Sequence, residues 1–93
     1  MRAKGSVRRS VIAGTWYPGT AGQLERAVKE YLANVPERED ERELLGLIVP
    51  HAGYQYSGQV AAYAYKQLEG RSYEAIIILA PSHRAWVGEF AVS

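Results

Sequence analysis

The chain has 93 residues, of which 47% are hydrophobic and 23% are charged, and its formal net charge is +1. This balance is typical of a folded globular protein and excludes a disordered or collagen-like chain. A charge so close to neutral produces no overall field that would attract nucleic acid or an anionic membrane surface. We therefore expect one small globular domain with no nucleic-acid or membrane partner.

The absence of cysteine limits the chemistry open to the chain. Any metal must be bound by nitrogen and oxygen ligands, because no thiolate is present. The basic residues near the N-terminus are not followed by an apolar run of signal-peptide length, and no stretch is long enough to span a membrane. The sequence therefore predicts a cytoplasmic protein, and its small core makes self-association an expectation as well.

The first half of the chain predicts one amphipathic helix followed by a polar connection. Thr20 and Gln23 fit a capping box, in which a hydroxyl and an amide satisfy donors at the start of a helix. Apolar side chains then recur at helical spacing, on Leu24, Val28, Tyr31 and Leu32. Pro36 ends this pattern, and the charged residues 37–43 are typical of a solvated connection.

The second half predicts a strand, a helix and a second strand. Residues 44–49 form an apolar run that stops at a proline, and residues 75–79 are a second, β-branched run. Between them we expect a helix from Gly58 to about Leu68, ended by Gly70. Two strands joined in this way run parallel. The predicted fold class is therefore α/β, a partial three-layer fold with a parallel βαβ core.

His51 and His83, the only histidines in the chain, each follow one of these predicted strands. Neighbouring parallel strands lie about 4.8 Å apart, so both imidazoles are expected to reach one ion at the carboxyl edge of the sheet. Imidazole is a ligand for zinc, copper and iron, and a catalytic site generally has a third protein ligand and an open position. The plainer alternative is that both are loop histidines that only form hydrogen bonds.

Other side chains are candidates for a substrate pocket beside these histidines. The rings of Trp16, Tyr17, Tyr54 and Tyr56 suit a pocket wall, and packing in the core is an equal alternative. Arg84, in the second loop, suits an anionic group as a bidentate donor, whereas most loop arginines are simply solvated. Both interpretations stay open for each residue.

Three separated segments together resemble the N-terminal part of the Memo-like proteins. They are Ala-Gly-Thr-Trp-Tyr-Pro at 13–18, Pro-His-Ala-Gly-Tyr-Gln-Tyr-Ser-Gly at 50–58 with Ala-Ala-Tyr-Ala-Tyr at 61–65, and Pro-Ser-His-Arg at 81–84. That family is similar in fold to the class III extradiol dioxygenases, which use non-heme iron. The resemblance implies that residues 1–93 form a single partial domain, a truncated version of the larger dioxygenase-like fold that corresponds to about the first third of the family's domain.

Carried over to this sequence, the resemblance implies metal ligands at His51 and His83, with Trp16 and Tyr56 lining the pocket they face. The implied metal is divalent, iron first and copper or zinc as alternatives. A further cysteine ligand of the family falls in the part that these residues do not cover. Relatives in bacteria and archaea imply a partner from a radical S-adenosylmethionine system.

Two functions of different classes follow from these observations. The first is a metal-dependent redox or dioxygenase-like protein, in which Tyr56 transfers a proton and Trp16, Tyr54 and Arg84 bind substrate. The alternative is a non-catalytic module that binds a peptide or protein in the same cleft. A third hypothesis is a truncated product without independent function, exposing unpaired strand edges. Whether the chain is an enzyme stays open in the sequence.

Overall fold

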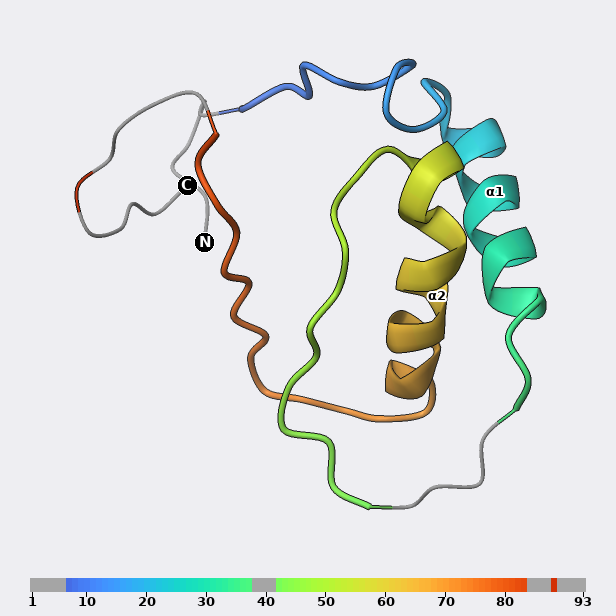
Figure 1. The fold of residues 1–93 in the computed structure, drawn as a ribbon, viewed down its shortest axis with the longest axis vertical. Coiled ribbons are helices and arrows are strands. Elements are labelled where there is room, and N and C mark those ends of the chain that lie inside the picture. Colours follow the sequence, from blue (N-terminus) through green and yellow to red (C-terminus); the bar gives the residue numbers. More distant parts are fainter. Residues whose placement is uncertain (1–6, 38–41, 84–87, 89–93) are drawn as a thin grey trace.

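The computed structural model describes residues 7–37, 42–83 and 88, and the regular elements of this part of the chain are all helical (Figure 1). None of its helices has both the length and the apolar character needed to cross a membrane. The elements in chain order are α1 (Ala21–Ala33), the π-helical turn η1 (Tyr54–Gly58), α2 (Gln59–Tyr65) and the 3-10 turn η2 (Lys66–Leu68).

Helix α1 begins where the capping pattern predicts. The Thr20 side chain accepts a hydrogen bond from the backbone N–H of Gln23 at 3.3 Å, which satisfies one of the donors at the start of the helix. The helix ends at Asn34, whose backbone N–H donates to the Glu30 carbonyl. A local sequence signal therefore sets the first turn of α1.

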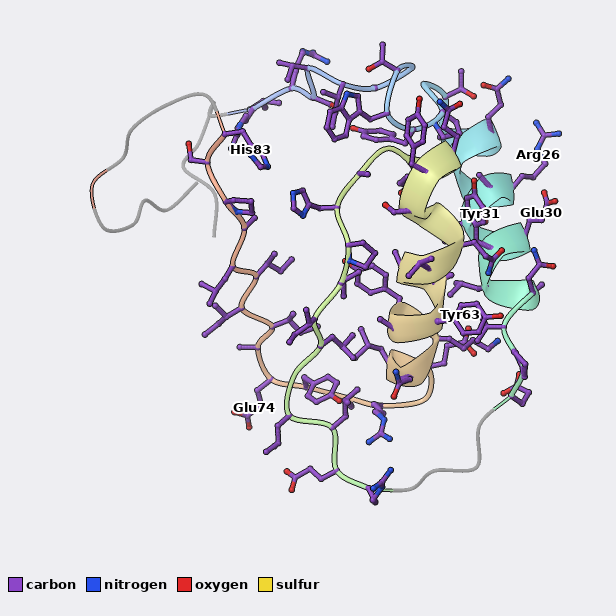
Figure 2. The ribbon with its side chains drawn as sticks, viewed as in Figure 1. Arg26, Glu30, Tyr31, Tyr63, Glu74 and His83 are labelled. Atoms are coloured by element: carbon purple, nitrogen blue, oxygen red, sulfur yellow. The ribbon has the colours of Figure 1, made fainter. Side chains whose placement is uncertain are left out.

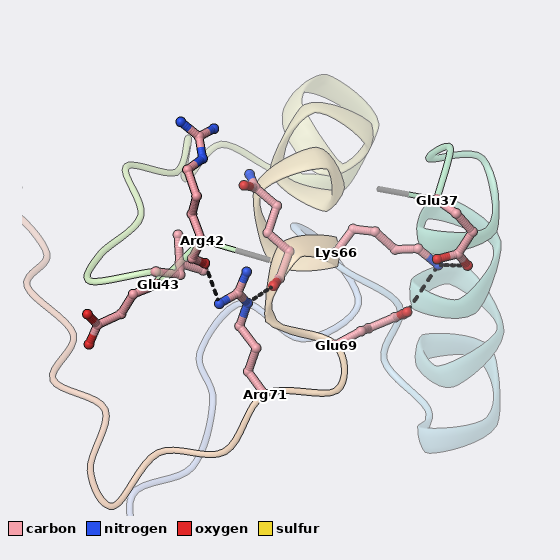
Figure 3. A pocket seen from close by; sticks show the side chains of 8 residues that line it. Glu37, Arg42, Glu43, Lys66, Glu69 and Arg71 are labelled. Atoms are coloured by element: carbon pink, nitrogen blue, oxygen red, sulfur yellow. Dashed lines mark hydrogen bonds and ion pairs between the residues drawn. The ribbon is translucent and has the colours of Figure 1, made fainter. Parts of the chain in front are cut away.

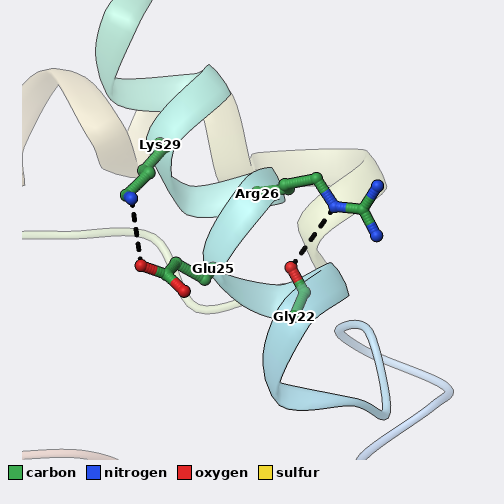
Figure 4. Close-up of polar contacts among 4 residues, drawn as sticks. All are labelled: Gly22, Glu25, Arg26 and Lys29. Atoms are coloured by element: carbon green, nitrogen blue, oxygen red, sulfur yellow. Dashed lines mark hydrogen bonds and ion pairs between the residues drawn. The ribbon is translucent and has the colours of Figure 1, made fainter.

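The outer face of α1 is polar and solvated. Lys29 Nζ lies 3.0 Å from Glu25 Oε1, and Arg26 Nε donates to the Gly22 carbonyl at 3.4 Å (Figure 4). Arg26 and Glu30 point away from α2 in Figure 2. Exposed ion pairs of this kind contribute little to stability, about 0.3–0.5 kcal/mol for a pair four residues apart. The opposite face must therefore supply the packing energy.

Helices α1 and α2 pack closely through small residues, and a side-chain hydrogen bond links them. Val35 and Ala62 are the buried hydrophobic residues in the described part of the chain. A Cβ placed on Gly58 would lie only 3.0 Å from the Tyr31 ring, so glycine is what allows this approach. Gln59 Nε2 donates to the Tyr31 carbonyl at 2.8 Å. The resulting core is small and lies between the two helices.

The helix predicted for residues 58–68 is present, although its form differs along its length. It begins as the π-helical turn η1, continues as α2 and tightens into η2. Gly70, with a φ of +77°, follows the last turn. A left-handed residue just beyond a helix end is a common stop signal, and glycine adopts it without steric penalty.

The predicted parallel βαβ core is wrong for the described residues. Segments 44–49 and 75–79 are extended, but neither belongs to a strand, and no three-layer arrangement forms. The composition of a segment favours an extended backbone, whereas a strand exists only when a neighbour accepts and donates its hydrogen bonds. No backbone hydrogen bond joins these two segments. The sequence pattern predicted that both segments are extended, but it did not predict correctly whether they pair with each other.

A charged cluster joins the end of α1 to the end of α2 (Figure 3). Lys66 Nζ lies 3.4 Å from Glu37 Oε1 and 3.2 Å from Glu69 Oε2. Arg71 Nη1 donates to the Arg42 carbonyl at 2.9 Å. These groups line a pocket of about 320 Å³, together with Glu43, Leu44 and Gln67. Both described ends of the connection predicted at 37–43 are therefore tied down, and residues 38–41 lie outside the described part.

The ammonium group of Lys66 is stabilised in this cluster. Its side chain is only 12% exposed. The hydrogen bond with Glu69 raises the pKa of Lys66 above its usual value near 10.5, and the nearby charges of Glu37 and Glu69 raise it further, while burial opposes them. Lys66 therefore stays charged throughout the neutral range.

Candidate functional site

Trp16 is presented by a tight turn in the segment before α1. The backbone N–H of Gly14 donates to the Tyr17 carbonyl at 2.8 Å, and that of Trp16 donates to the Ile12 carbonyl at 3.0 Å. Gly14 has a φ of +86°, a conformation that side chains other than glycine rarely adopt. The Ser10 and Tyr17 hydroxyls also share a hydrogen bond. Local sequence chemistry therefore builds the loop that carries Trp16.

The loop after His51 is anchored on both sides. The backbone N–H of Tyr54 donates to the Trp16 carbonyl at 2.8 Å, and the Tyr31 hydroxyl donates to the Tyr54 carbonyl at 3.2 Å. Ser57 Oγ donates back to the Ala52 carbonyl at 3.2 Å. Tyr54 and Ser57 belong to the π-helical turn η1, which continues this loop, and such turns are often found at functional sites. The loop is thus tied to the Trp16 turn and to α1.

An apolar pocket of about 350 Å³ lies between this loop and the helices. Rings form much of its wall, since Tyr54 packs at a centroid distance of 5.8 Å from Tyr17 and edge-on at 6.0 Å from Tyr31. The lining residues are mostly apolar or aromatic: Ile12, Trp16, Tyr17, Val28, Tyr31, Leu32, Pro50, His51, Ala52, Tyr54, Ser57, Gly58, Ala61, Ala62 and Tyr65. The volume suits a small organic molecule.

The structure brings only some of the predicted substrate residues to this pocket. Trp16 and Tyr54 line it, and His51 lies at its wall. Tyr56 is 78% exposed and is not part of the lining. Arg84 lies outside the described residues. Trp16, Tyr17 and Tyr54 are therefore brought together and Tyr56 is not, and the roles assigned to these side chains stay predictions.

The two histidine rings meet through their Nε2 atoms. His51 Nε2 lies 3.1 Å from His83 Nε2, while the ring centroids are 5.3 Å apart and the ring planes differ by 26°. Because the centroids are much farther apart than the nitrogens, the rings approach edge to edge. Both side chains are exposed. As placed, this is the geometry of an N–H···N hydrogen bond, with one imidazole as the donor and the other as the acceptor.

The same separation fits two ligands of one metal ion. Nitrogens at neighbouring positions on an ion, each about 2.1 Å from it, lie roughly 3.0–3.4 Å apart in octahedral and tetrahedral geometry. The 3.1 Å between the two Nε2 atoms falls inside that range. As placed, the two Nε2 atoms face each other, so one ion could bind both only after the side chains rotate and the nitrogens shift. The separation is thus compatible with a shared ion, whereas the ring directions are those of a hydrogen bond.

The described residues supply two ligands rather than a full set. No group of three histidine, cysteine, aspartate or glutamate side chains that could hold a metal lies among residues 7–37, 42–83 and 88. A catalytic metal commonly has three protein ligands. A metal held by His51 and His83 would therefore need further ligands from outside the described residues, or from solvent and substrate.

Two residues support the site in ways that sequence reasoning did not predict: Tyr31, and Ser57, which the sequence suggested only as a helix cap. Tyr31 was assigned only to the apolar stripe of α1, yet its hydroxyl bonds the loop after His51. Ser57 holds the Ala52 carbonyl. A tyrosine in an apolar helical stripe weakly indicates a contact with another segment, because its hydroxyl needs a hydrogen-bond partner when it is partly buried.

Comparison with known proteins agrees with the motifs in this loop and turn. The family described as Memo-like protein matches residues 8–93. A "MEMO1 family protein" of Nitrosopumilus maritimus is 37% identical over 81 residues, which cover 83% of this chain and 30% of that protein. No solved structure matches the chain significantly.

Animal proteins show the same relationship. Human "Protein MEMO1" is 37% identical over 86 residues, covering 92% of this chain and 28% of that protein. The "Protein memo-1 homolog" of Caenorhabditis elegans is 42% identical over 76 residues, covering 82% of this chain and 21% of that protein. The chain thus spans less than a third of the length of these relatives. Because the family match extends over nearly the whole of its sequence, the chain belongs to the Memo-like protein family.

Proposed function

We propose that this chain supplies two imidazole ligands, His51 and His83, to a divalent-metal site of a redox or dioxygenase-like protein. The observation that carries the proposal is the 3.1 Å separation of their Nε2 atoms beside an aromatic pocket. These are the only two histidines in the sequence. Their meeting across 32 positions of the chain makes a shared ion a specific hypothesis.

Iron is the first choice of metal, with copper and zinc as alternatives. Imidazole suits all three, and iron or copper when bound would supply the activation of dioxygen or a peroxide. The exposure of both rings leaves coordination positions accessible to solvent and substrate. Family membership supports this assignment, since the matched region includes both histidines.

The pocket residues would bind and orient the substrate. Trp16 and Tyr54 offer ring faces to an apolar or aromatic group, and the pocket places that group next to His51. We assign proton transfer to Tyr56, whose backbone N–H is fixed by the Gly53 carbonyl at 2.9 Å and whose ring is exposed outside the pocket wall.

Metal titration tests the proposal. The purified chain is titrated anaerobically with iron(II), and separately with copper(II) and zinc(II). We expect one equivalent to bind, with copper(II) showing nitrogen superhyperfine coupling from two imidazoles. His51→Ala and His83→Ala should each weaken binding by at least about 10-fold, because one ligand is lost.

A matched variant separates metal binding from the hydrogen bond between the rings. His83→Gln keeps a polar partner for His51 but removes the imidazole ligand, so it should bind metal as poorly as His83→Ala. Failure of the wild-type chain to take up any of the three metals, or equal uptake by the double alanine variant, would contradict the proposal.

The alternative function, a peptide- or protein-binding module, rests on the same pocket. Its lining is mostly apolar and includes only one of the two histidines. A ligand that occupies this pocket without a metal would bind equally well to His83→Ala, because His83 does not line the pocket. Loss of binding in that variant would instead support the metal site.

A further inference from the structure

The hydroxyl of Ser57 does not cap a helix, although a serine just before a helix usually does. The N-cap of α2 is Gly58, and no side chain caps that helix. Ser57 lies in the last part of η1, and its Oγ donates to the Ala52 carbonyl at 3.2 Å. Serine hydroxyls in helices commonly donate to a carbonyl three or four residues earlier. Here the acceptor is five residues earlier and outside η1, so the bond joins the helical part of the chain to the residue next to His51.

The turn that carries Ser57 is itself fixed. The Gly53 carbonyl accepts hydrogen bonds from the backbone N–H groups of Tyr56 and Ser57, at 2.9 and 3.1 Å. The backbone N–H of Tyr54 donates to the Trp16 carbonyl at 2.8 Å, which ties the turn to the segment before α1. The Ser57 hydroxyl therefore starts from a position that is held by the backbone.

The chain before His51 has no comparable support. Within the described part of the chain, residues 45–50 make no backbone hydrogen bond. Pro50 also lacks an N–H group that could donate one. The described bond that does reach the backbone of residues 45–52 is the one from Ser57 to the Ala52 carbonyl. The backbone at His51 is therefore held from the side of Ala52.

We propose that Ser57 is a positioning residue, which holds the backbone of His51 so that its imidazole faces His83. The two Nε2 atoms lie 3.1 Å apart, and both side chains are exposed. Since exposed rings are not held by packing around them, the backbone has to keep them within reach of each other. For the ring contact this inference stands alone, and for metal binding it rests on the proposed function.

Loss of the hydroxyl is expected to affect His51 more than the fold. Ala52 is exposed, so water can replace Ser57 as the donor to its carbonyl. A water molecule satisfies the carbonyl but does not tie it to η1. Ser57→Ala should therefore leave the turn folded and release His51, whereas Ser57→Thr keeps a hydroxyl at the same position and should restore the contact.

Nuclear magnetic resonance of the complete metal-free chain tests the positioning role. We expect a nuclear Overhauser effect between the ring protons of His51 and His83 in the wild type, its loss in Ser57→Ala and its return in Ser57→Thr. Hydrogen exchange at the Tyr54 amide, which donates to the Trp16 carbonyl, should stay equally slow in all three proteins. That amide reports whether the turn remains folded.

Metal titration gives a second measurement. Anaerobic titration with zinc(II) or copper(II) should show about 10-fold weaker binding to Ser57→Ala, the lower end of the range for residues that orient metal ligands. Ser57→Thr should bind as the wild type does. Ser72→Ala is the matched control, because Ser72 is exposed and its hydroxyl has no hydrogen bond within the described residues.

The outcomes separate this role from the proposed function. Absence of the ring contact in the wild type, an unchanged contact in Ser57→Ala, or metal binding by the wild type that Ser57→Ala does not weaken would overturn the positioning role. So would faster exchange at the Tyr54 amide in Ser57→Ala, since Ser57 would then support the whole turn. If the wild type binds no metal while the ring contact is lost in Ser57→Ala and restored in Ser57→Thr, the proposed function fails and the positioning role stands.

Discussion

At the scale of single residues, Tyr31 is the side chain that joins α1 to the loop after His51. Its ring packs edge-on against Tyr54 and its hydroxyl bonds the Tyr54 carbonyl at 3.2 Å. Figure 2 shows Tyr31 on α1 and Tyr63 on α2, closer to the other end of the two helices. Tyr31 thus acts on the candidate metal site only through the loop that it holds.

Tyr31→Phe removes this hydrogen bond and keeps the ring. We expect the free energy of unfolding to fall by about 0.5–1.5 kcal/mol, because the Tyr54 carbonyl loses its donor. The measurement is urea unfolding followed by far-UV circular dichroism. Tyr63→Phe is the matched control, since Tyr63 is half exposed and its hydroxyl has no hydrogen bond within the described residues. Equal effects of the two substitutions would contradict a special role for Tyr31.

At the scale of elements, the approach of α2 to α1 depends on the lack of a side chain at Gly58. A Cβ there would lie 3.0 Å from the Tyr31 ring and 3.3 Å from Tyr54 Cβ. Gly22, in the first turn of α1, has nothing within 4 Å of the same position. Two glycines in helical conformation therefore differ only in their surroundings.

These two glycines predict opposite effects of alanine. Gly22→Ala should stabilise the chain by about 0.5–1 kcal/mol, because alanine loses less backbone entropy in a helix. Gly58→Ala should destabilise it, since the Tyr31 ring is held by the hydrogen bond to Tyr54 and by close packing, so it has little room to move. Thermal unfolding of both variants checks the sign. A stabilising Gly58→Ala would show that the helices separate easily.

At the scale of the whole molecule, the cluster around Lys66 joins three segments of the chain at one end of the structure. It links the residue after α1 to the end of α2, and the neighbouring Arg71 to Arg42 bond ties down the start of the first extended segment. The histidine contact lies at the other end of the extended segments, so polar contacts link them at both ends, while Val35 and Ala62 are the buried hydrophobic residues of the described chain.

This cluster predicts a pH dependence of stability. The pKa of Lys66 is raised in the folded chain, so its contribution is fully present below the unfolded value near 10.5 and is lost as the pH rises through the folded value. The difference in unfolding free energy between wild type and Lys66→Met should be constant from pH 7 to pH 9 and should shrink above about pH 10.5. Urea unfolding of both proteins at pH 7, 9 and 11 measures it.

Lys29→Met is the control for this comparison. Its partner Glu25 lies 3.0 Å away, but both side chains are well exposed, so the substitution should change stability by less than about 0.5 kcal/mol at pH 7. A Lys66 contribution no larger than that of Lys29 would contradict a structural role for the cluster.

Local signals in the sequence determined the helices. The Thr20 cap, the apolar stripe of α1 and the glycine after η2 act within one or two helical turns, so they need no knowledge of the rest of the fold. The family also follows from local motifs, which the match over residues 8–93 confirms. The backbone shape of 44–49 and 75–79 is likewise a local property.

Only the tertiary structure decided the pairing of those segments and the contacts of the site. Strand pairing is a non-local hydrogen-bond pattern, and composition cannot say whether a partner is present, which is why the βαβ prediction was wrong. The bond from Tyr31 to the Tyr54 carbonyl joins residues 23 positions apart. The sequence did predict that His51 and His83 lie side by side, but at the edge of a sheet that the described residues do not form, so the form of their 3.1 Å contact comes from the structure alone. Such contacts depend on how the chain turns back on itself, which no short pattern in the sequence records.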